Sequence, residues 1–137
     1  MNDDARQKIW EVHNQLRSLV AKGEAKDKLG GYAPKAARMY RLEYDCELEK
    51  FAGIHAKKCQ IKQSDRNAKK EAARDWFSEL AKYGVGKENV FRKEFTEQSG
   101  TKIERYTQMV WQTTTSLGCA IQNCKKMTLF VCNYRDA

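Results

Sequence analysis

The chain has 137 residues, 41% of them hydrophobic, and this length suits one globular domain with a single core. Its formal net charge of +8 favours polyanions such as sulfated glycans, anionic lipid or nucleic acid, although a basic surface can also serve only to keep a protein soluble. The basic residues alternate with acids and show no basic-aromatic pattern, which disfavours nucleic acid as a partner, and no apolar run is long enough for a transmembrane segment.

Five cysteines in so short a chain are typical of a disulfide framework rather than of scattered cytosolic thiols. Clustered cysteines can also bind zinc, but the spacing of Cys119, Cys124 and Cys132 matches no CxxC pair. The N-terminal segment MNDDARQK is charged, unlike a signal peptide. We therefore expect a secreted, extracellular protein whose leader is absent from this chain; the alternative is a cytosolic protein.

A first helix is predicted near the N-terminus. Asp3 or Asp4 can cap it and Gly23 is placed to end it. Its apolar residues at helical spacing are Ile9, Val12, Leu16, Leu19 and Val20. Residues 24–34, which include a Gly pair and the only Pro, are predicted to form a loop.

Two further helices follow, and the chain then changes to strands. Asp45 is expected to cap the second helix, with one buried face formed by Leu48, Phe51, Ala52, His55 and Cys59. Ser64 or Asp65 opens the third, which ends at Gly84 and buries Ala72, Trp76, Phe77 and Leu80. Residues 118–122 and 127–134 are predicted as strands joined by a turn, and helices followed by strands indicate an α+β layered domain.

Five segments carry a resemblance to a known family: HNQLRS, APKAARMYRLEYDCELEKFA, WFSEL, YTQMVWQTTTSLGCAIQNC and VCNY. In this order they are similar to the cysteine-rich secretory, antigen 5 and pathogenesis-related (CAP) superfamily, and in particular to the nematode activation-associated secreted, or venom allergen-like, proteins. The resemblance covers nearly the whole chain. It implies one domain over residues 1–137 with an α+β fold: a shortened three-layer α-β-α sandwich with a small antiparallel sheet.

The same resemblance implies a central cavity at which two His and two Glu can bind a divalent metal such as zinc. Glu79, three residues after Trp76, retains one of these four positions. The first His position falls on Gln63, the GEN motif that carries the other Glu is missing with its strand, and Arg105 stands in place of the second His. We therefore predict no metal and no cofactor.

Arg105 is always protonated at physiological pH, so it would repel a divalent ion. We interpret it as a replacement for the metal's charge, in a salt bridge to Glu79; the alternative is a solvent-pointing side chain on a relaxed loop. Glu88, in a GKENVF segment that mimics the missing motif, is interpreted as a surface residue. His13 and His55 are expected to be hydrogen-bonded packing residues, and with no His base beside a Ser or Cys at a recognisable motif we predict no enzyme.

The resemblance also implies the cysteine pairing. Cys119 would pair with Cys132, and Cys59 with Cys124. Cys46 would remain as a buried free thiol, the alternative being an intermolecular disulfide.

The hydrophobic residues of YTQMVW are expected to build the core, and without the GEN region sterol binding is doubtful. We predict a secreted, non-catalytic binding protein at the parasite-host interface, an immunomodulator that engages a host protein or cell-surface receptor; the sequence does not specify its oligomeric state. One alternative is a polyanion- or lipid-binding protein driven by the basic surface, for which sulfated glycans are candidate partners. Another is a residual metal-dependent hydrolase that uses Glu79.

Overall fold

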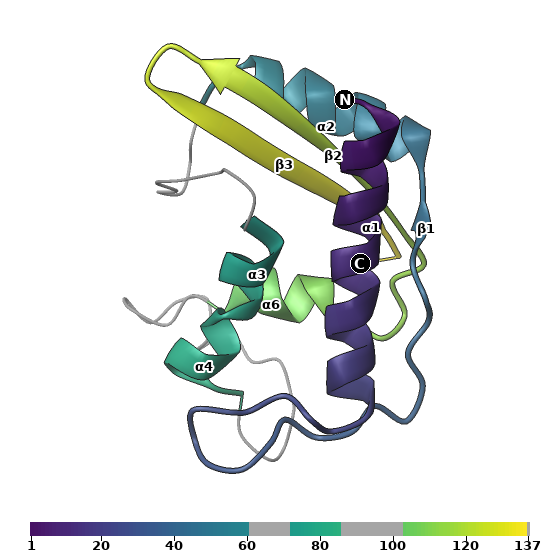
Figure 1. Ribbon diagram of the computed structural model, residues 1–137, viewed down its shortest axis with the longest axis vertical. Coiled ribbons are helices and arrows are strands. Elements are labelled where there is room, and N and C mark those ends of the chain that lie inside the picture. The colour runs from purple at the N-terminus through teal and green to yellow at the C-terminus, as the bar shows by residue number, and fades with distance from the viewer. Residues whose placement is uncertain (61–71, 86–102, 137) are drawn as a thin grey trace.

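The computed structural model describes residues 1–60, 72–85 and 103–136. In chain order the elements are α1 (Asp3–Ala21), β1 (Glu43–Tyr44), α2 (Cys46–Lys57), α3 (Ala72–Phe77), α4 (Glu79–Tyr83), α6 (Glu104–Met109), β2 (Ser116–Cys124) and β3 (Met127–Arg135). Figure 1 shows the long β2–β3 hairpin between α2 on one side and α1 on the other. No helix in these described ranges has the length and apolar character needed to cross a bilayer.

The sheet has three strands in the order β1-β2-β3. β2 and β3 pair antiparallel, with Cys119 opposite Cys132, so the predicted hairpin is confirmed. β1 adds a short parallel strand, in which Glu43 pairs with Ser116. The sheet is therefore mixed rather than antiparallel. Two residues are too few to show the alternation that marks a strand in sequence, so β1 could not be predicted from a pattern.

Successive residues of the hairpin point to opposite faces of the sheet, and each face packs against helices. On one face, side chains of α2 and the hairpin form a small core of Ala52, Ala56, Ala120, Leu129 and Val131. On the other face, side chains of α1 pack against Leu42, Leu117, Cys119, Phe130 and Cys132. The ring of Trp76 in α3 lies 5.3 Å from that of Phe130 on this second face. The α-β-α sandwich is thus confirmed.

α2 lies unusually close to β2, and a glycine makes this possible. A Cβ atom at Gly118 would overlap the backbone nitrogen of Glu49 and the carbonyl oxygen of Asp45. Only small side chains fit between the helix and the hairpin, and for this reason Ala52 and Ala56 are the buried residues of α2. The predicted buried face is wrong for Phe51, whose side chain is 52% exposed, and for His55, which is exposed.

Two of the predicted ends of α1 and α2 agree with the structure, and one does not. Asp45 caps α2 as predicted, since its side chain accepts hydrogen bonds from the backbone N–H groups of Glu47 and Leu48. α1 ends at Ala21, just before Gly23 with a φ of +74°. The predicted cap of α1 is wrong: the side chain of Asn2, not of Asp3 or Asp4, accepts from the backbone N–H of Ala5 at 2.8 Å.

The predicted third helix is broken at Ser78 into α3 and α4, and it ends at Gly84 as expected. Its expected start at Ser64 or Asp65 lies outside the described residues. Leu80 is fully buried as predicted, whereas Trp76 and Phe77 are only partly buried because they lie at the edges of two separate cores.

Candidate functional site

Two of the predicted cavity positions meet at the N-termini of α4 and α6, which lie side by side in Figure 1. Glu79 is the first residue of α4, and its side chain is 3% exposed. Arg105 Nε donates to Glu79 Oε1 at 2.6 Å, and the backbone N–H of Tyr106 donates to Oε2 at 3.0 Å. Both carboxylate oxygens of Glu79 are therefore engaged by residues of α6.

The electrostatics of this pair reflect its burial. Desolvation raises the pKa of Glu79 above its ordinary value, while the Tyr106 N–H and the Arg105 guanidinium oppose that rise. Arg105 itself is 26% exposed, so its charge is partly solvated. The rings of Phe77 and Tyr106 pack edge to face at 5.4 Å beside the pair and help to exclude water.

These residues do not fit a divalent metal. Arg105 places a fixed positive charge against the one retained carboxylate, and a cation would have to displace two hydrogen bonds to reach it. Within residues 1–60, 72–85 and 103–136, no group of three or more His, Cys, Asp or Glu is placed to hold a metal ion. Gln63 and Glu88 lie outside the described residues, so their predicted roles stay predictions.

The two histidines differ sharply in environment. His13 is fully buried, as predicted for a packing residue. Its Nδ1–H donates to the Ile9 carbonyl at 2.9 Å, so Nε2 accepts from the Tyr134 hydroxyl, also at 2.9 Å. Burial lowers the pKa of His13 to about 4, which keeps the ring neutral at physiological pH. The packing role predicted for His55 is wrong, because its side chain is exposed on the outer face of α2.

The cysteines form two bridges in the structure. Cys59 is bonded to Cys124 and Cys119 to Cys132, with Cα atoms 5.9 and 4.1 Å apart. Cys46 is free, but the expectation that it is buried is wrong: it is the first residue of α2 and its side chain is exposed. The first bridge ties the end of α2 to the hairpin turn, and the second joins the two strands.

Arg17 in α1 is a structural centre that the sequence did not reveal. It is 2% exposed, and its guanidinium donates five hydrogen bonds to four backbone carbonyls, those of Tyr40, Met109, Trp111 and Thr114. Burial lowers its pKa to about 10, so it stays charged at neutral pH. In sequence, Arg17 lies in the HNQLRS segment, one turn after His13 and on the same side of α1.

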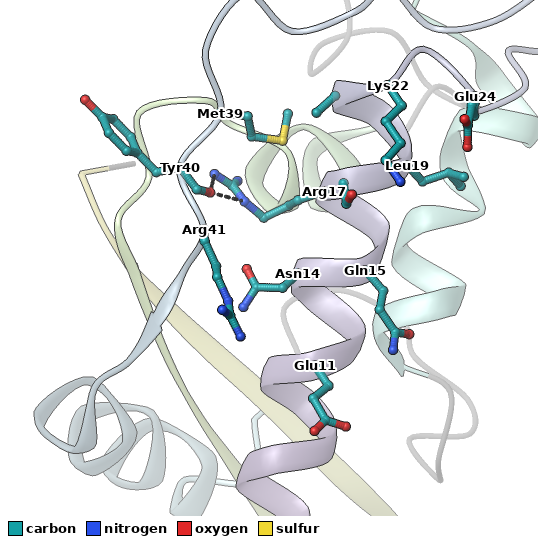
Figure 2. A pocket seen from close by; sticks show the side chains of 12 residues that line it. Glu11, Asn14, Gln15, Arg17, Leu19, Lys22, Glu24, Met39, Tyr40 and Arg41 are labelled. Carbon is teal, nitrogen blue, oxygen red and sulfur yellow. Dashed lines mark hydrogen bonds between the residues drawn. The ribbon is translucent and has the colours of Figure 1, made fainter.

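Arg17 fixes residues 38–41, here called the 38–41 segment, against α1. Figure 2 shows its guanidinium reaching the Tyr40 carbonyl. Asn14 fixes the next residue, since its side chain both donates to the Leu42 carbonyl and accepts from the Leu42 N–H. The segment is therefore held at Tyr40, and at the residue that follows it, by side chains of α1.

The side chains of Arg38, Tyr40 and Arg41 are exposed, whereas that of Met39 is half-buried and packs against the core. The guanidinium of Arg38 lies 5.0 Å from the centre of the Tyr40 ring, and that of Arg41 lies 4.6 Å from a ring of Trp10. Such cation-π contacts limit the freedom of both arginines. Tyr40 remains 39% exposed, and nearby Trp111 is 40% exposed, which contradicts the expectation that Trp111 belongs to the core.

Two hollows flank the segment. One, of about 790 Å³, is open and lies between α1 and the segment. Figure 2 shows the polar side chains of Glu11, Asn14 and Gln15 in α1, and of Lys22 just after it, along this hollow. The other, of about 550 Å³, is mainly apolar, with Val20, Pro34, Val85, Tyr106, Val110 and Trp111 in its lining. Met39 lines both. The 38–41 segment thus forms a ridge between the two hollows.

Comparison with known families and proteins gives consistent relatives. The family model described as "Cysteine-rich secretory protein family" matches residues 10–134. The Ancylostoma secreted protein of Ancylostoma caninum is 40% identical over 98% of this chain and 37% of its own length. Hookworm platelet inhibitor 1 of the same species is 28% identical over 98% of this chain and 64% of its own length.

Solved structures give the same picture. Na-ASP-1 superposes with a TM-score of 0.89 at 39% identity, over 98% of this chain and 39% of that one. NaASP2, solved with Zn²⁺, superposes with a TM-score of 0.85 at 42% identity, and the match covers 98% of this chain and 80% of that one. The hookworm platelet inhibitor superposes with a TM-score of 0.72 at 28% identity, and the match covers 100% of this chain and 71% of that one. The chain spans less than two fifths of the Ancylostoma secreted protein and of Na-ASP-1.

Proposed function

The chain belongs to the cysteine-rich secretory protein family, and from that premise we propose that it is a secreted, non-catalytic protein that binds a host protein at the parasite-host interface. Two of its relatives support this: one is named as a secreted protein of Ancylostoma, and another is named as a hookworm platelet inhibitor. We further propose that its effect on the host is immunomodulation through a cell-surface receptor.

The state of the cavity positions supports a non-catalytic role. Each oxygen of Glu79 accepts a hydrogen bond, from Arg105 or from a backbone N–H, and the side chain is only 3% exposed, so a substrate has little access to this carboxylate. His13 is buried between Ile9 and Tyr134. In the described part of the chain, neither histidine is hydrogen-bonded to a Ser or Cys that could act as a nucleophile.

The single observation that carries the proposal is the rigid 38–41 segment. Protein interfaces are enriched in Tyr, Trp, Met and Arg, and affinity is highest where such residues are held in place before binding. Here Arg38, Tyr40 and Arg41 present exposed side chains next to the half-buried Met39, and Arg17 fixes the backbone at the Tyr40 carbonyl. The hollow on each side of the ridge offers room for side chains of a partner.

The charge of the segment specifies the kind of partner. Arg38 and Arg41 are exposed, and in the described residues neither is paired with a carboxylate. An interfacial arginine that meets a carboxylate gains paired hydrogen bonds, so a complementary partner presents acidic residues around an apolar centre. We therefore expect a protein receptor with an acidic rim at its binding site.

The test is binding of labelled, disulfide-intact protein to host leukocytes at low and high salt, with and without heparin as competitor. Binding to a shaped protein surface should survive both salt and competitor, because buried apolar contacts are not screened. Loss of all binding under both conditions would contradict the proposal and leave net charge as the sole cause of attachment.

A matched pair of tyrosine variants locates the contact. Tyr40→Ala removes the centre of the 38–41 segment and should weaken salt-resistant binding by about tenfold, the usual effect of a central aromatic residue. Tyr32→Ala is the control, since Tyr32 is 57% exposed but lies in the loop before the segment. Equal effects of the two variants would place the receptor contact elsewhere.

A further inference from the structure

A cluster of lysines surrounds the Cys59–Cys124 disulfide, at the end of the sandwich where α2 stops and the hairpin turns. Four lysines, here called the four-lysine patch, belong to it: Lys57, Lys58, Lys125 and Lys126. Two are at the C-terminus of α2, and two form the turn between β2 and β3. Figure 1 shows this turn beside the far end of α2, and the disulfide holds the two Cα atoms 5.9 Å apart.

No carboxylate in the described part of the chain compensates the charge of the four-lysine patch. All four side chains are exposed, and none is in an ion pair with a carboxylate of the described residues. The two acids of α2 lie at its opposite end and are bonded elsewhere, Glu47 to Arg135 and Glu49 to Arg6. A positive field is therefore concentrated at one end of the molecule.

Local backbone structure accounts for two of the four lysines but not for the other two. Cations are favoured in the last turn of a helix, which accounts for the pair in α2. A two-residue hairpin turn instead favours Gly, Asn or Asp, and Lys125 and Lys126 do not adopt the positive φ angles of the preferred turns. Their charge, rather than their backbone geometry, is the property that they contribute.

We propose that the four-lysine patch binds a sulfated polysaccharide. Ammonium groups on two rigid elements, joined covalently, present a preformed set of point charges that an extended polyanion can meet without ordering the protein first. This contact lies on other elements than the 38–41 segment and does not depend on the proposed receptor. The proposal gives polyanion binding a defined location on the surface, which the net charge of the chain does not specify.

Two other polyanions fit less well. Attachment to an anionic membrane is strongest when apolar side chains protrude among the cations. Residues 123–126 at the tip of the hairpin are Asn, Cys, Lys and Lys, and the exposed Phe51 and Ile54 lie further back along α2. Single-stranded nucleic acid needs aromatic rings on which bases stack, and no aromatic residue lies among the four lysines.

The experiment compares two variants of equal charge by calorimetry with a heparin oligosaccharide at physiological salt. Lys57→Gln, Lys58→Gln, Lys125→Gln and Lys126→Gln together neutralise the four-lysine patch. Lys22→Gln, Lys26→Gln, Lys28→Gln and Lys35→Gln remove the same charge from exposed lysines of another region. We expect the first variant to weaken heparin binding by about tenfold or more and the second by about twofold or less.

Three results would overturn the proposal. Equal losses in both variants would mean that only net charge matters, and undetectable heparin binding by the unmodified protein would mean that the patch has no such ligand. Binding to vesicles of phosphatidylcholine and phosphatidylserine, but not to heparin, would assign the patch to membranes. Desulfated heparin is the ligand control, and its affinity should fall to the level of the patch variant. Salt-resistant leukocyte binding by the patch variant would leave the receptor proposal intact.

Discussion

The Glu79–Arg105 pair offers the sharpest test of how the cavity positions now work. Glu79→Ala removes the acceptor of two hydrogen bonds and leaves the backbone N–H of Tyr106 without its partner. Glu79→Gln is the matched variant, because the amide oxygen can still accept from Tyr106 while the negative charge is lost. Comparing the two separates the hydrogen bond from the charge.

The magnitudes follow from burial. Leaving a buried N–H unpaired costs about 1–3 kcal/mol. Arg105 is 26% exposed and can be partly solvated when unpaired, so the ion pair adds about 1 kcal/mol rather than the larger loss of a fully buried pair. We expect Glu79→Ala to lower the free energy of unfolding by about 2–4 kcal/mol. Glu79→Gln should cost clearly less, because its amide oxygen keeps the Tyr106 hydrogen bond and burial already favours a neutral side chain at this site.

The assay is urea unfolding of Glu79→Ala, Arg105→Met and the double variant, with disulfides intact. A double-mutant cycle cancels whatever else Arg105 contacts and isolates its coupling to Glu79. We expect a coupling energy of about 1 kcal/mol. A loss below about 0.5 kcal/mol in Glu79→Ala, or a coupling energy near zero, would refute the reasoning that this pair is buried and stabilising.

The pH dependence of the pair has a defined sign. Burial raises the pKa of Glu79 in the folded protein, so the folded state binds its proton more readily than the unfolded state. The contribution of Glu79 to stability therefore rises as the pH falls from above the folded pKa toward the unfolded value. Glu79→Gln should lack this component. An unchanged pH profile in that variant would contradict the direction assigned to the shift.

Two further predictions concern the core. Because burial lowers the pKa of His13 from 6.5 to about 4, the unfolded chain takes up a proton first, and stability should fall by roughly 3 kcal/mol between pH 6.5 and 4. The free energy of unfolding, measured with urea across that range, should fall with pH in the unmodified protein and in His55→Gln, and should fall less in His13→Gln. Equal pH dependence in all three proteins would contradict the prediction. Gly118→Ala should cost more than about 3 kcal/mol or prevent folding, since its Cβ would overlap the backbone of α2. Gly53→Ala is its control, because the added Cβ would lie 3.9 Å from Ala120 Cβ, an ordinary contact, and Ala favours the helix by about 1 kcal/mol. Comparable losses in the two variants would show that the helix can shift away from Gly118.

Family resemblance led to the candidate site, but only partly to its geometry. It selected Glu79 and Arg105, which are 26 residues apart, and the structure joins them through Arg105 Nε. Nothing in local sequence indicated that a backbone N–H of α6 would hold the second oxygen. Arg17 was missed for a related reason: a charged residue within a helix is usually solvated, and only the approach of four carbonyls from distant segments makes its burial favourable.

The sequence by itself determined the features that depend on neighbours along the chain. Asp45 can cap only the helix that follows it, Gly23 ends α1 with a positive φ, and β-branched and aromatic residues on either side of a short turn form the hairpin. Tertiary structure decided which side chains are buried. Cys46 and His55 are exposed because α2 docks through its alanines, and burial depends on that docking rather than on periodicity alone.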